Sequence, residues 1–235
     1  MEFKGFQKTS LIEYPGKIVS VAFVGGCNFR CPFCQNPELV LSFKNLPSIG
    51  EEKIIEHLIQ KRKWLDGLAI TGGEPTLYGD LPDFIKRVRK EGFLVQVETN
   101  GTNPRMIRNL IEEDAVSYIA LDIKAPLVWE KYRKAAGIKE RDLFEKVEET
   151  VQILLSSDID YELRTTVVPT LVDEEEIGKI ARQVRGAKKY VLQQFRNEKT
   201  LDESYNRLEP YPKEKLEKIR QRIKDFFPVC EIRGV

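Results

Sequence analysis

The chain is poor in the residues that most often carry hydrolytic chemistry or span membranes. Its 235 residues include four cysteines, two methionines and one histidine. With a single histidine, no Cys–His pair or Ser–His–Asp set is evident, so a hydrolytic nucleophile finds no support. The longest apolar stretch, near Ile18–Val24, is far too short to cross a bilayer. The first ten residues lack the apolar core of a signal peptide. We therefore expect a cytoplasmic protein.

Net charge is also nearly absent. Thirty-eight basic residues face thirty-seven acidic ones, so no overall field favours nucleic acid or anionic lipid as a partner. The hydrophobic fraction of 41% and the charged fraction of 32% argue against disorder. A chain of this length can bury a substantial core, so it needs neither disulfides nor a metal merely to fold. In a reducing compartment, clustered thiols more often bind metal or react than form disulfides.

Short β-type runs alternate with amphipathic helical runs from about residue 17 onward. The expected strands are Lys17–Val24, Gly67–Thr71, Phe93–Glu98, Ser117–Ile123, Tyr161–Val168 and Tyr190–Phe195. Six repeats of strand and helix predict an α/β fold with a parallel sheet, either doubly wound or an open, partial (β/α) barrel. We expect one domain over residues 1–235, with a core of about 17–195. A last helix is expected at Lys213–Phe227 and a short strand at Val229–Ile232.

Several single residues carry local predictions. Ser48 and Glu51 have the spacing of a capping box at a helix start. Trp64 and Trp129 have apolar neighbours and are interpreted as packing residues. His57 lies in a charged helix and is expected at the surface. Cys230 lies in an apolar context, and free cysteine is among the most buried residue types, so we expect a core thiol there.

Polar residues gather where the expected strands end. They are Cys27, Cys31 and Cys34 after the first strand, Thr71–Pro75 after the second, Glu98–Gly101 after the third, Asp122 and Lys124 at the fourth, Arg164 in the fifth, and Gln193 and Gln194 in the sixth. In parallel α/β sheets and barrels, ligands bind at the carboxyl ends of the strands. We interpret these residues as one site.

The spacing Cys27-x3-Cys31-x2-Cys34 has two metal interpretations. Structural zinc takes four closed ligands, so Cys230 would have to fold back to complete a zinc site. A cubane iron–sulfur cluster also takes four ligands, but one iron can be left for a ligand other than cysteine. The residues of the loop alone leave both interpretations open.

Together the motifs resemble a known superfamily. The run Cys27-x3-Cys31-Pro32-Phe33-Cys34, followed by Gly72-Gly73-Glu74-Pro75 after the next strand, resembles the radical S-adenosylmethionine (radical SAM) superfamily. This resemblance implies a partial (β/α)6 barrel, a 4Fe–4S cluster on the three cysteines, and SAM bound at the fourth iron. It further implies that Phe33 passes along the adenine and that Gly72, Gly73 and Glu74 bind the methionine ammonium.

The resemblance also assigns roles to residues farther along the chain. It implies that Lys124 and Arg164 contact the carboxylate or ribose of SAM, and it places Gln35, Asn100 and Asp122 among the SAM-binding residues. A strand-end ion pair is the alternative for Asp122 and Lys124. Glu98, Thr99 and Asp122 resemble positions that bind a monovalent cation in related enzymes, although the family has Asp where this chain has Glu98. Relatives usually have His where this chain has Gln35, which cannot titrate.

A narrower resemblance covers most of the chain to about residue 195. The segment Gly5–Lys17, the run Gly26–Pro32, Asn36-Pro37 and Glu98–Gly101 are similar to the activating proteins of anaerobic (class III) ribonucleotide reductases, which are related to pyruvate formate-lyase activating enzymes. This implies an oxidoreductase that abstracts a glycine Cα hydrogen from a protein partner and receives electrons from a flavodoxin- or ferredoxin-type donor. The alternatives are a small-molecule radical SAM enzyme, such as a deazaguanine-carboxylate synthase, and a zinc-stabilised α/β binding protein.

Overall fold

The computed structural model describes all 235 residues and divides them into two compact units. The first unit holds residues 1–27, 38–99 and 105–120. The second holds residues 28–37, 100–104 and 121–235. The boundary between the units falls within residues 27–34, called here the cysteine loop. Cys27 belongs to the first unit, and Cys31 and Cys34 belong to the second.

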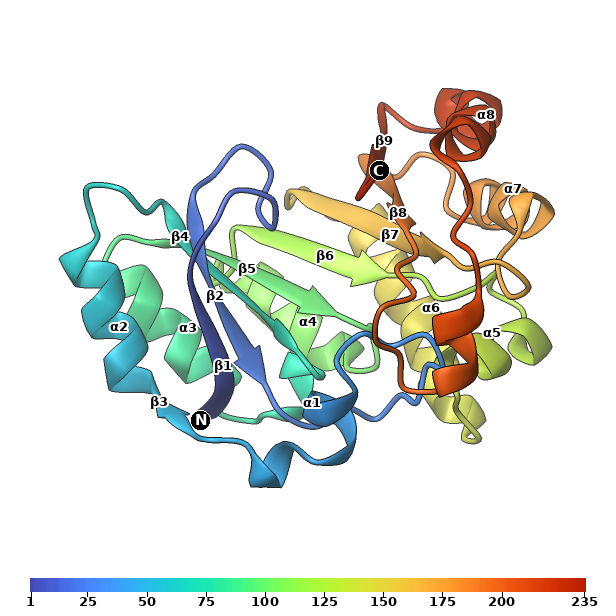
Figure 1. The fold of residues 1–235 in the computed structure, drawn as a ribbon. Coiled ribbons are helices and arrows are strands. Elements are labelled where there is room, and N and C mark those ends of the chain that lie inside the picture. Colours follow the sequence, from blue (N-terminus) through green and yellow to red (C-terminus); the bar gives the residue numbers. More distant parts are fainter. The chain divides into compact units, whose positions relative to one another are not determined.

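The first unit is built on a mixed sheet whose strands run in the order β3-β1-β2-β4-β5 (Figure 1). Their bounds are β1 Glu2–Ser10, β2 Val19–Val24, β3 Ile49–Gly50, β4 Gly67–Gly72 and β5 Leu94–Thr99. β2, β4 and β5 are parallel, whereas β1 is antiparallel to both β2 and β3. Val19, Val21 and Ala69 are completely buried, as expected for strands covered on both faces.

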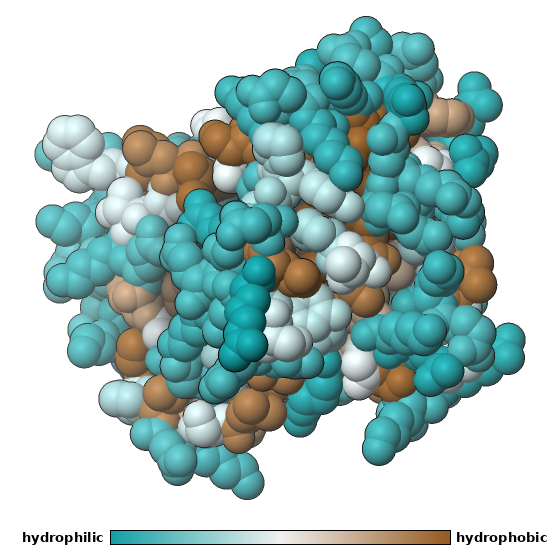
Figure 2. Space-filling view, turned by 45° about the vertical axis from the view of Figure 1, so that its right-hand side comes forward, coloured by the Kyte–Doolittle hydropathy of each residue, from teal (hydrophilic) through white to brown (hydrophobic).

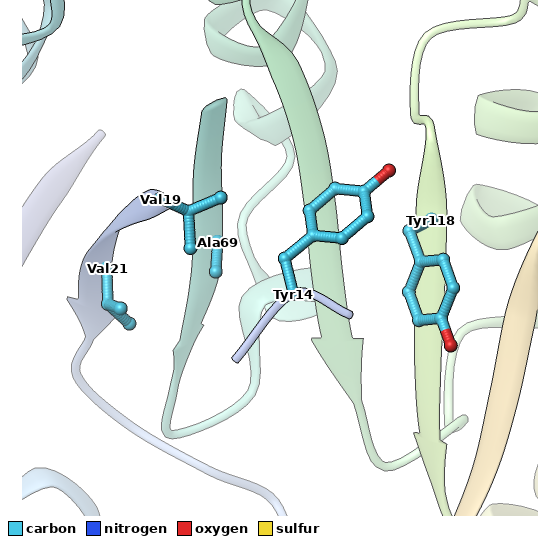
Figure 3. Packing of buried hydrophobic residues seen from close by; sticks show 5 residues of the cluster. All are labelled: Tyr14, Val19, Val21, Ala69 and Tyr118. Carbon is cyan, nitrogen blue, oxygen red and sulfur yellow. The ribbon is translucent and has the colours of Figure 1, made fainter. Parts of the chain in front are cut away.

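Short connections and amphipathic helices join these strands. The helices are α1 Pro37–Leu41, α2 Glu51–Gln60, α3 Leu81–Lys90 and α4 Pro104–Glu112, with single 3-10 turns at Phe43–Asn45 and Pro75–Leu77. The chain between β1 and β2 folds back so that the ring of Tyr14 packs 5.2 Å from that of Tyr118, measured between centroids (Figure 3). Tyr14 thereby joins Val19, Val21 and Ala69 in a buried cluster beside the amino-terminal ends of the strands.

Strand β6, Tyr118–Asp122, passes from the first unit into the second. The Ser117 amide just before β6 donates to the carbonyl of Val95 on β5. The Ile123 amide just after it donates to the carbonyl of Arg164 on β7. The second unit continues with the parallel strands β7-β8-β9, which are Tyr161–Val167, Lys189–Gln194 and Val229–Arg233.

The helices of the second unit are α5 Trp129–Ala136, α6 Arg141–Leu155, α7 Glu174–Gln183 and α8 Lys213–Ile223, with 3-10 turns at Glu203–Arg207 and Lys224–Phe226. α7 begins at Asp173, whose carboxylate accepts a hydrogen bond from the Glu176 amide. α7 and α8 lie side by side, and α8 leads into β9 (Figure 1). Glu162 on β7 is completely buried and makes two 2.5 Å hydrogen bonds with Arg233, which attaches β9 to the sheet.

All six expected strands form, each within two residues of its predicted bounds. The capping box is wrong, because α2 starts at Glu51 after Gly50 and Ser48 is hydrogen-bonded to Lys4 and Glu2 on β1 instead. Trp64 is also not a packing residue, since it is 75% exposed. Cys230 is half-buried on β9 rather than in the core.

The visible surface is largely hydrophilic, with apolar residues scattered among charged ones (Figure 2). This agrees with the high proportion of charged residues in the chain. No helix is long and apolar enough to cross a membrane.

Candidate functional site

In the first unit Gly72, the last residue of β4, and Gly73, which follows it, lie against the chain that leads into Cys27. The amide of Gly73 donates to the Val24 carbonyl over 2.9 Å, and the amide of Glu74 donates to the Gly26 carbonyl over 2.8 Å. A Cβ atom at Gly73 would lie 1.8 Å from the Gly26 oxygen, and one at Gly72 would lie 2.5 Å from the Val24 oxygen. Glycine is therefore required at both positions to let the two loops touch, a constraint that the sequence motif alone did not reveal.

Glu74 is almost completely buried, with 1% of its surface exposed, so it is not a solvated turn residue. Its Oε1 accepts hydrogen bonds from the Thr76 amide, the Thr76 hydroxyl and the Thr99 hydroxyl, over 3.0, 2.6 and 2.7 Å. Buried charge is tolerated where hydrogen bonds of this kind stabilise it. The ends of β4 and β5 thus hold one oriented carboxylate.

A second carboxylate of the first unit, Glu98, also has fixed partners. The Thr71 hydroxyl donates to its Oε2 over 2.9 Å, and Gln96 donates to its Oε1 over 3.0 Å. Gln96 is completely buried, and its side-chain oxygen has no hydrogen-bond partner. The carboxyl-terminal half of β5 therefore carries several polar side chains, as the sequence predicted for the end of this strand.

In the second unit, residues Cys31 to Cys34 form a tight turn. The Cys34 amide donates to the Cys31 carbonyl over 3.0 Å, and Pro32 occupies the second position, where its fixed φ favours a turn. Cys31 is buried, whereas Cys34 is half-buried. Phe33 is 5% exposed, so its ring is enclosed by protein.

The end of α5 supports this turn from one side. The Arg30 amide donates to the Ala136 carbonyl over 2.8 Å, and Cys31 Sγ lies 3.8 Å from the same oxygen. Gly137 follows with a φ of +63°, and a Cβ atom there would lie 2.1 Å from the Arg30 oxygen. Helix α5 was not expected from the sequence, and its glycine cap would have been the signal for it.

Two asparagines link the cysteine loop to the segment after β5. Asn100 donates to the Asn28 side-chain oxygen over 2.8 Å, and Asn28 donates to the Thr102 hydroxyl over 2.8 Å. The Thr102 amide and hydroxyl in turn donate to the Asn100 oxygen. Asn100, which the sequence placed near the cofactor, thus contacts the loop between Cys27 and Cys31. Asn28 and Thr102 were not singled out from the sequence.

Three charged residues meet where the end of β6 lies beside the middle of β7. Asp122 accepts from Lys124 Nζ over 2.8 Å and from Arg164 Nε over 2.9 Å. Burial alone would raise the pKa of Asp122, but the charges of Arg164 and Lys124 outweigh it and lower that pKa to about 2. Burial would lower the pKa of Lys124, but the negative charge of Asp122 outweighs it and raises that pKa above its ordinary value. All three groups are therefore charged at neutral pH.

The cysteine loop offers thiols, which as thiolates are ligands for iron and zinc. Three thiols lie within eight residues of the chain, Cys27 in the first unit and Cys31 and Cys34 in the second. Within neither unit do three or more His, Cys, Asp or Glu side chains lie together so as to hold a metal ion. Cys230 is remote in sequence, and burial raises the pKa of its thiol to about 11, which disfavours the thiolate that ligates a metal.

Comparison with protein families decides which kind of protein this is. Residues 21–184 match the model of the radical SAM superfamily, which is well over half of the chain. The chain belongs to the radical SAM superfamily. Membership implies a 4Fe–4S cluster and SAM as cofactors. A further match, to the LPS binding domain of CAP18 over residues 213–228, is confined to α8 and the turn after it. Since Leu216, Ile219 and Ile223 of α8 are buried in the protein, that match shows no second family.

Curated relatives show to which group within the superfamily the chain belongs. The chain is 34% identical over 238 residues to a Methanocaldococcus jannaschii protein provisionally named a glycyl-radical enzyme activating enzyme, covering 98% of this chain and 96% of the relative. It is 25% identical to the pyruvate formate-lyase-activating enzyme of Clostridium pasteurianum, with 94% and 95% covered. A 7-carboxy-7-deazaguanine synthase of Aquifex aeolicus is 42% identical, but over only 33% of each chain. The chain is therefore an enzyme of the glycyl-radical activating group.

Similar solved structures confirm the fold. A radical SAM methyltransferase from Sphaerobacter thermophilus aligns with a TM-score of 0.66 at 16% identity, covering 96% of this chain and 70% of that one. SuiB of Streptococcus suis aligns with a TM-score of 0.70 at 12% identity, covering 91% of this chain and 48% of SuiB. The partial-barrel α/β fold predicted from the sequence is confirmed, and the doubly wound alternative is not needed.

Proposed function

We propose that this enzyme makes the glycyl radical of an anaerobic ribonucleotide reductase, with Cys27, Cys31 and Cys34 as the ligands of its 4Fe–4S cluster. The observation that carries the proposal is the Cys31–Cys34 turn, in which one backbone hydrogen bond holds two of the cysteines close together and Cys31 is buried. When bound, the cluster and SAM supply a 5′-deoxyadenosyl radical by one-electron cleavage of the sulfonium S–C5′ bond. A fourth cysteine would not be needed, because one iron of such a cluster can take a ligand other than cysteine.

The charged residues of the site suit the polar ends of SAM. Glu74 is a buried carboxylate held in one orientation, which fits the methionine ammonium. Lys124 and Arg164 carry fixed positive charges, which fit the carboxylate or the ribose hydroxyls. The backbone at Phe33 would pass along the adenine while its buried ring anchors the turn, and Asn100 holds the loop between the first two cysteines. These residues orient SAM and exclude water around it.

A monovalent cation is not included in the proposal. Glu98 is hydrogen-bonded to Thr71 and Gln96, Thr99 to Glu74, and Asp122 to Lys124 and Arg164. Furthermore, Glu98 and Thr99 belong to the first unit and Asp122 to the second. The cation therefore stays a prediction of the sequence resemblance.

The protein partner is proposed from the length and the cysteine content of the chain. With three of its four cysteines in the cysteine loop, the chain has too few left to bind a second iron–sulfur cluster. The near-complete coverage of an activating-enzyme relative agrees with a chain that acts on another protein. We propose a flavodoxin- or ferredoxin-type electron donor in a reducing, cytoplasmic setting.

A second candidate is supported by the 42% identity to 7-carboxy-7-deazaguanine synthase over 79 residues. In that case the radical would act on a small molecule rather than on a glycine of a protein. The third alternative, a zinc-stabilised binding protein, predicts that the purified protein is colourless, holds zinc and is insensitive to air.

The deciding experiment mixes the reduced, iron-loaded enzyme and SAM with the ribonucleotide reductase of the same organism. We expect a glycyl radical on the reductase by electron paramagnetic resonance, and one 5′-deoxyadenosine per radical. SAM cleavage with no radical on the reductase, but with turnover to 7-carboxy-7-deazaguanine, would establish the second candidate. Stoichiometric zinc without SAM cleavage would reject both.

A further inference from the structure

Residues 196–211, called here the 196–211 segment, form a loop that is closed by its own hydrogen bonds. Thr200 is 5% exposed, and its hydroxyl lies 2.7 Å from both the Asp202 carbonyl and the Asn206 side-chain oxygen. Asn197 donates to the Leu208 carbonyl, and Gln194 on β8 donates to that of Tyr211. The segment therefore has a defined structure of its own.

The 196–211 segment is bonded to the cysteine turn at two points. The Asp202 amide donates to the carbonyl of Pro32, which lies between Cys31 and Cys34, over 2.9 Å. Gln35, immediately after Cys34, donates from Nε2 to the Arg196 carbonyl over 3.1 Å. The backbone is thus held on both sides of Cys34. The opposite end of the turn is held by α5, through the bond from Arg30 to Ala136.

We infer that Gln35 is a positioning residue, which fixes Cys34 for its metal by attaching the cysteine turn to the 196–211 segment. Cys34 is half-buried, so the cysteine turn needs support from outside the core. The bond requires an N–H donor at position 35, because its acceptor is a backbone carbonyl. Partners that orient a metal ligand also tune the metal, and hydrogen bonds and solvent exposure near the sulfurs set cluster potentials.

This inference rests on the proposed cluster but is tested first without it. Gln35→Met keeps the shape and neutrality of the side chain and removes the donor, whereas Gln35→His retains a ring N–H. Gln152→Met is the matched control, since Gln152 is exposed on α6 of the same unit. Thr200→Val loosens the 196–211 segment from within. Hydrogen–deuterium exchange is measured on the cluster-free protein, in peptides covering residues 28–37 and 196–211.

We expect Gln35→Met to speed exchange about fivefold in both peptides, as the loss of one net hydrogen bond would. Thr200→Val should do the same in the 196–211 peptide, Gln35→His should restore slow exchange, and Gln152→Met should match wild type. In the iron-loaded enzyme, Gln35→Met should change the g-values and the midpoint potential of the reduced cluster, and Gln35→His should reverse the change.

Unaltered exchange in Gln35→Met would overturn the inference. So would faster exchange with an unchanged cluster signal, because the bond would then be structural without positioning the ligand. If wild type takes up no iron, the proposed function fails instead, while the exchange of the cluster-free protein still decides whether Gln35 attaches the two segments.

Discussion

Arg164 on β7 places its Nε 2.9 Å from Oδ1 of Asp122 at the end of β6, and Lys124 binds the other oxygen of the same carboxylate. Two cations therefore share one anion, which leaves a net positive charge on this side of the second unit. A third of the Asp122 side chain remains exposed, so the group is accessible to an anionic ligand. One net positive charge on two oriented cations is the arrangement expected where a carboxylate of a substrate or cofactor is to bind.

Asp122→Asn should destabilise the protein by about 2 kcal/mol. Removing one partner of a buried ion pair typically costs ~3–5 kcal/mol, and the partial exposure of Asp122 reduces that cost through solvent screening. Urea unfolding gives the measurement, with Asp158→Asn as the control, since Asp158 is exposed. A loss no greater than that of the control would show that the three charges contribute nothing to stability.

The contribution of Asp122 should depend on pH in a defined window. Its folded-state pKa is about 2, below the value of roughly 3.9 expected for an unfolded chain. A carboxylate whose pKa is lower in the folded state stabilises that state at pH values above the unfolded-state pKa. This stabilisation is lost as the pH falls through the folded-state pKa. The stability difference between wild type and Asp122→Asn should therefore be constant from pH 5 to 8 and shrink below about pH 4. A difference that grows on acidification would contradict the assigned charges.

Thr99→Val should weaken both stability and SAM binding. The substitution keeps the size of the side chain but removes a donor to the buried Glu74, at a cost of roughly 1–3 kcal/mol. Thr9→Val is the control, because Thr9 is exposed on β1 of the same unit. Thermal unfolding and equilibrium binding of SAM to the iron-loaded enzyme measure the two effects. If the two variants unfold at the same temperature and bind SAM equally well, Glu74 does not take part in SAM binding.

Gly137→Ala should disturb the cysteine turn far more than Gly16→Ala does. Both glycines have a left-handed φ, +63° and +70°, so each substitution carries a similar backbone cost of about 1–2 kcal/mol. A Cβ at Gly16 meets nothing within 4 Å, whereas one at Gly137 meets the Arg30 carbonyl at 2.1 Å. Unfolding and iron uptake of the two variants isolate this close contact. Matching results would mean that α5 does not support the turn.

The strands were predictable because their signal is local. β2 and β4 are nearly continuous apolar runs, and burial on both faces produces that pattern. β1 was missed because its sequence is mostly polar and half-exposed, and it forms by pairing with β2. The pairing of β1 with β3 brings Ser48 into contact with β1 residues, so its capping-box spacing has no structural effect.

The site residues were predictable in identity but not in arrangement. The spacing of Cys27, Cys31 and Cys34 and the Gly72-Gly73-Glu74 motif are visible in the sequence. The contact of Gly73 with the Gly26 carbonyl is not, since it depends on how two distant loops approach. The bond from Gln35 to Arg196 joins residues 161 positions apart, and no local pattern signals such a partner.

The most direct test of the account is SAM cleavage by four variants, in each of which one cysteine is replaced by alanine. Cleavage is measured as the 5′-deoxyadenosine that the anaerobically reconstituted, reduced enzyme forms. Cys27→Ala, Cys31→Ala and Cys34→Ala should each abolish cleavage and lower iron uptake, whereas Cys230→Ala should cleave SAM nearly as well as wild type. Full activity in any of the first three, or loss of activity in a folded Cys230→Ala, would contradict the assignment of the cluster to the cysteine loop.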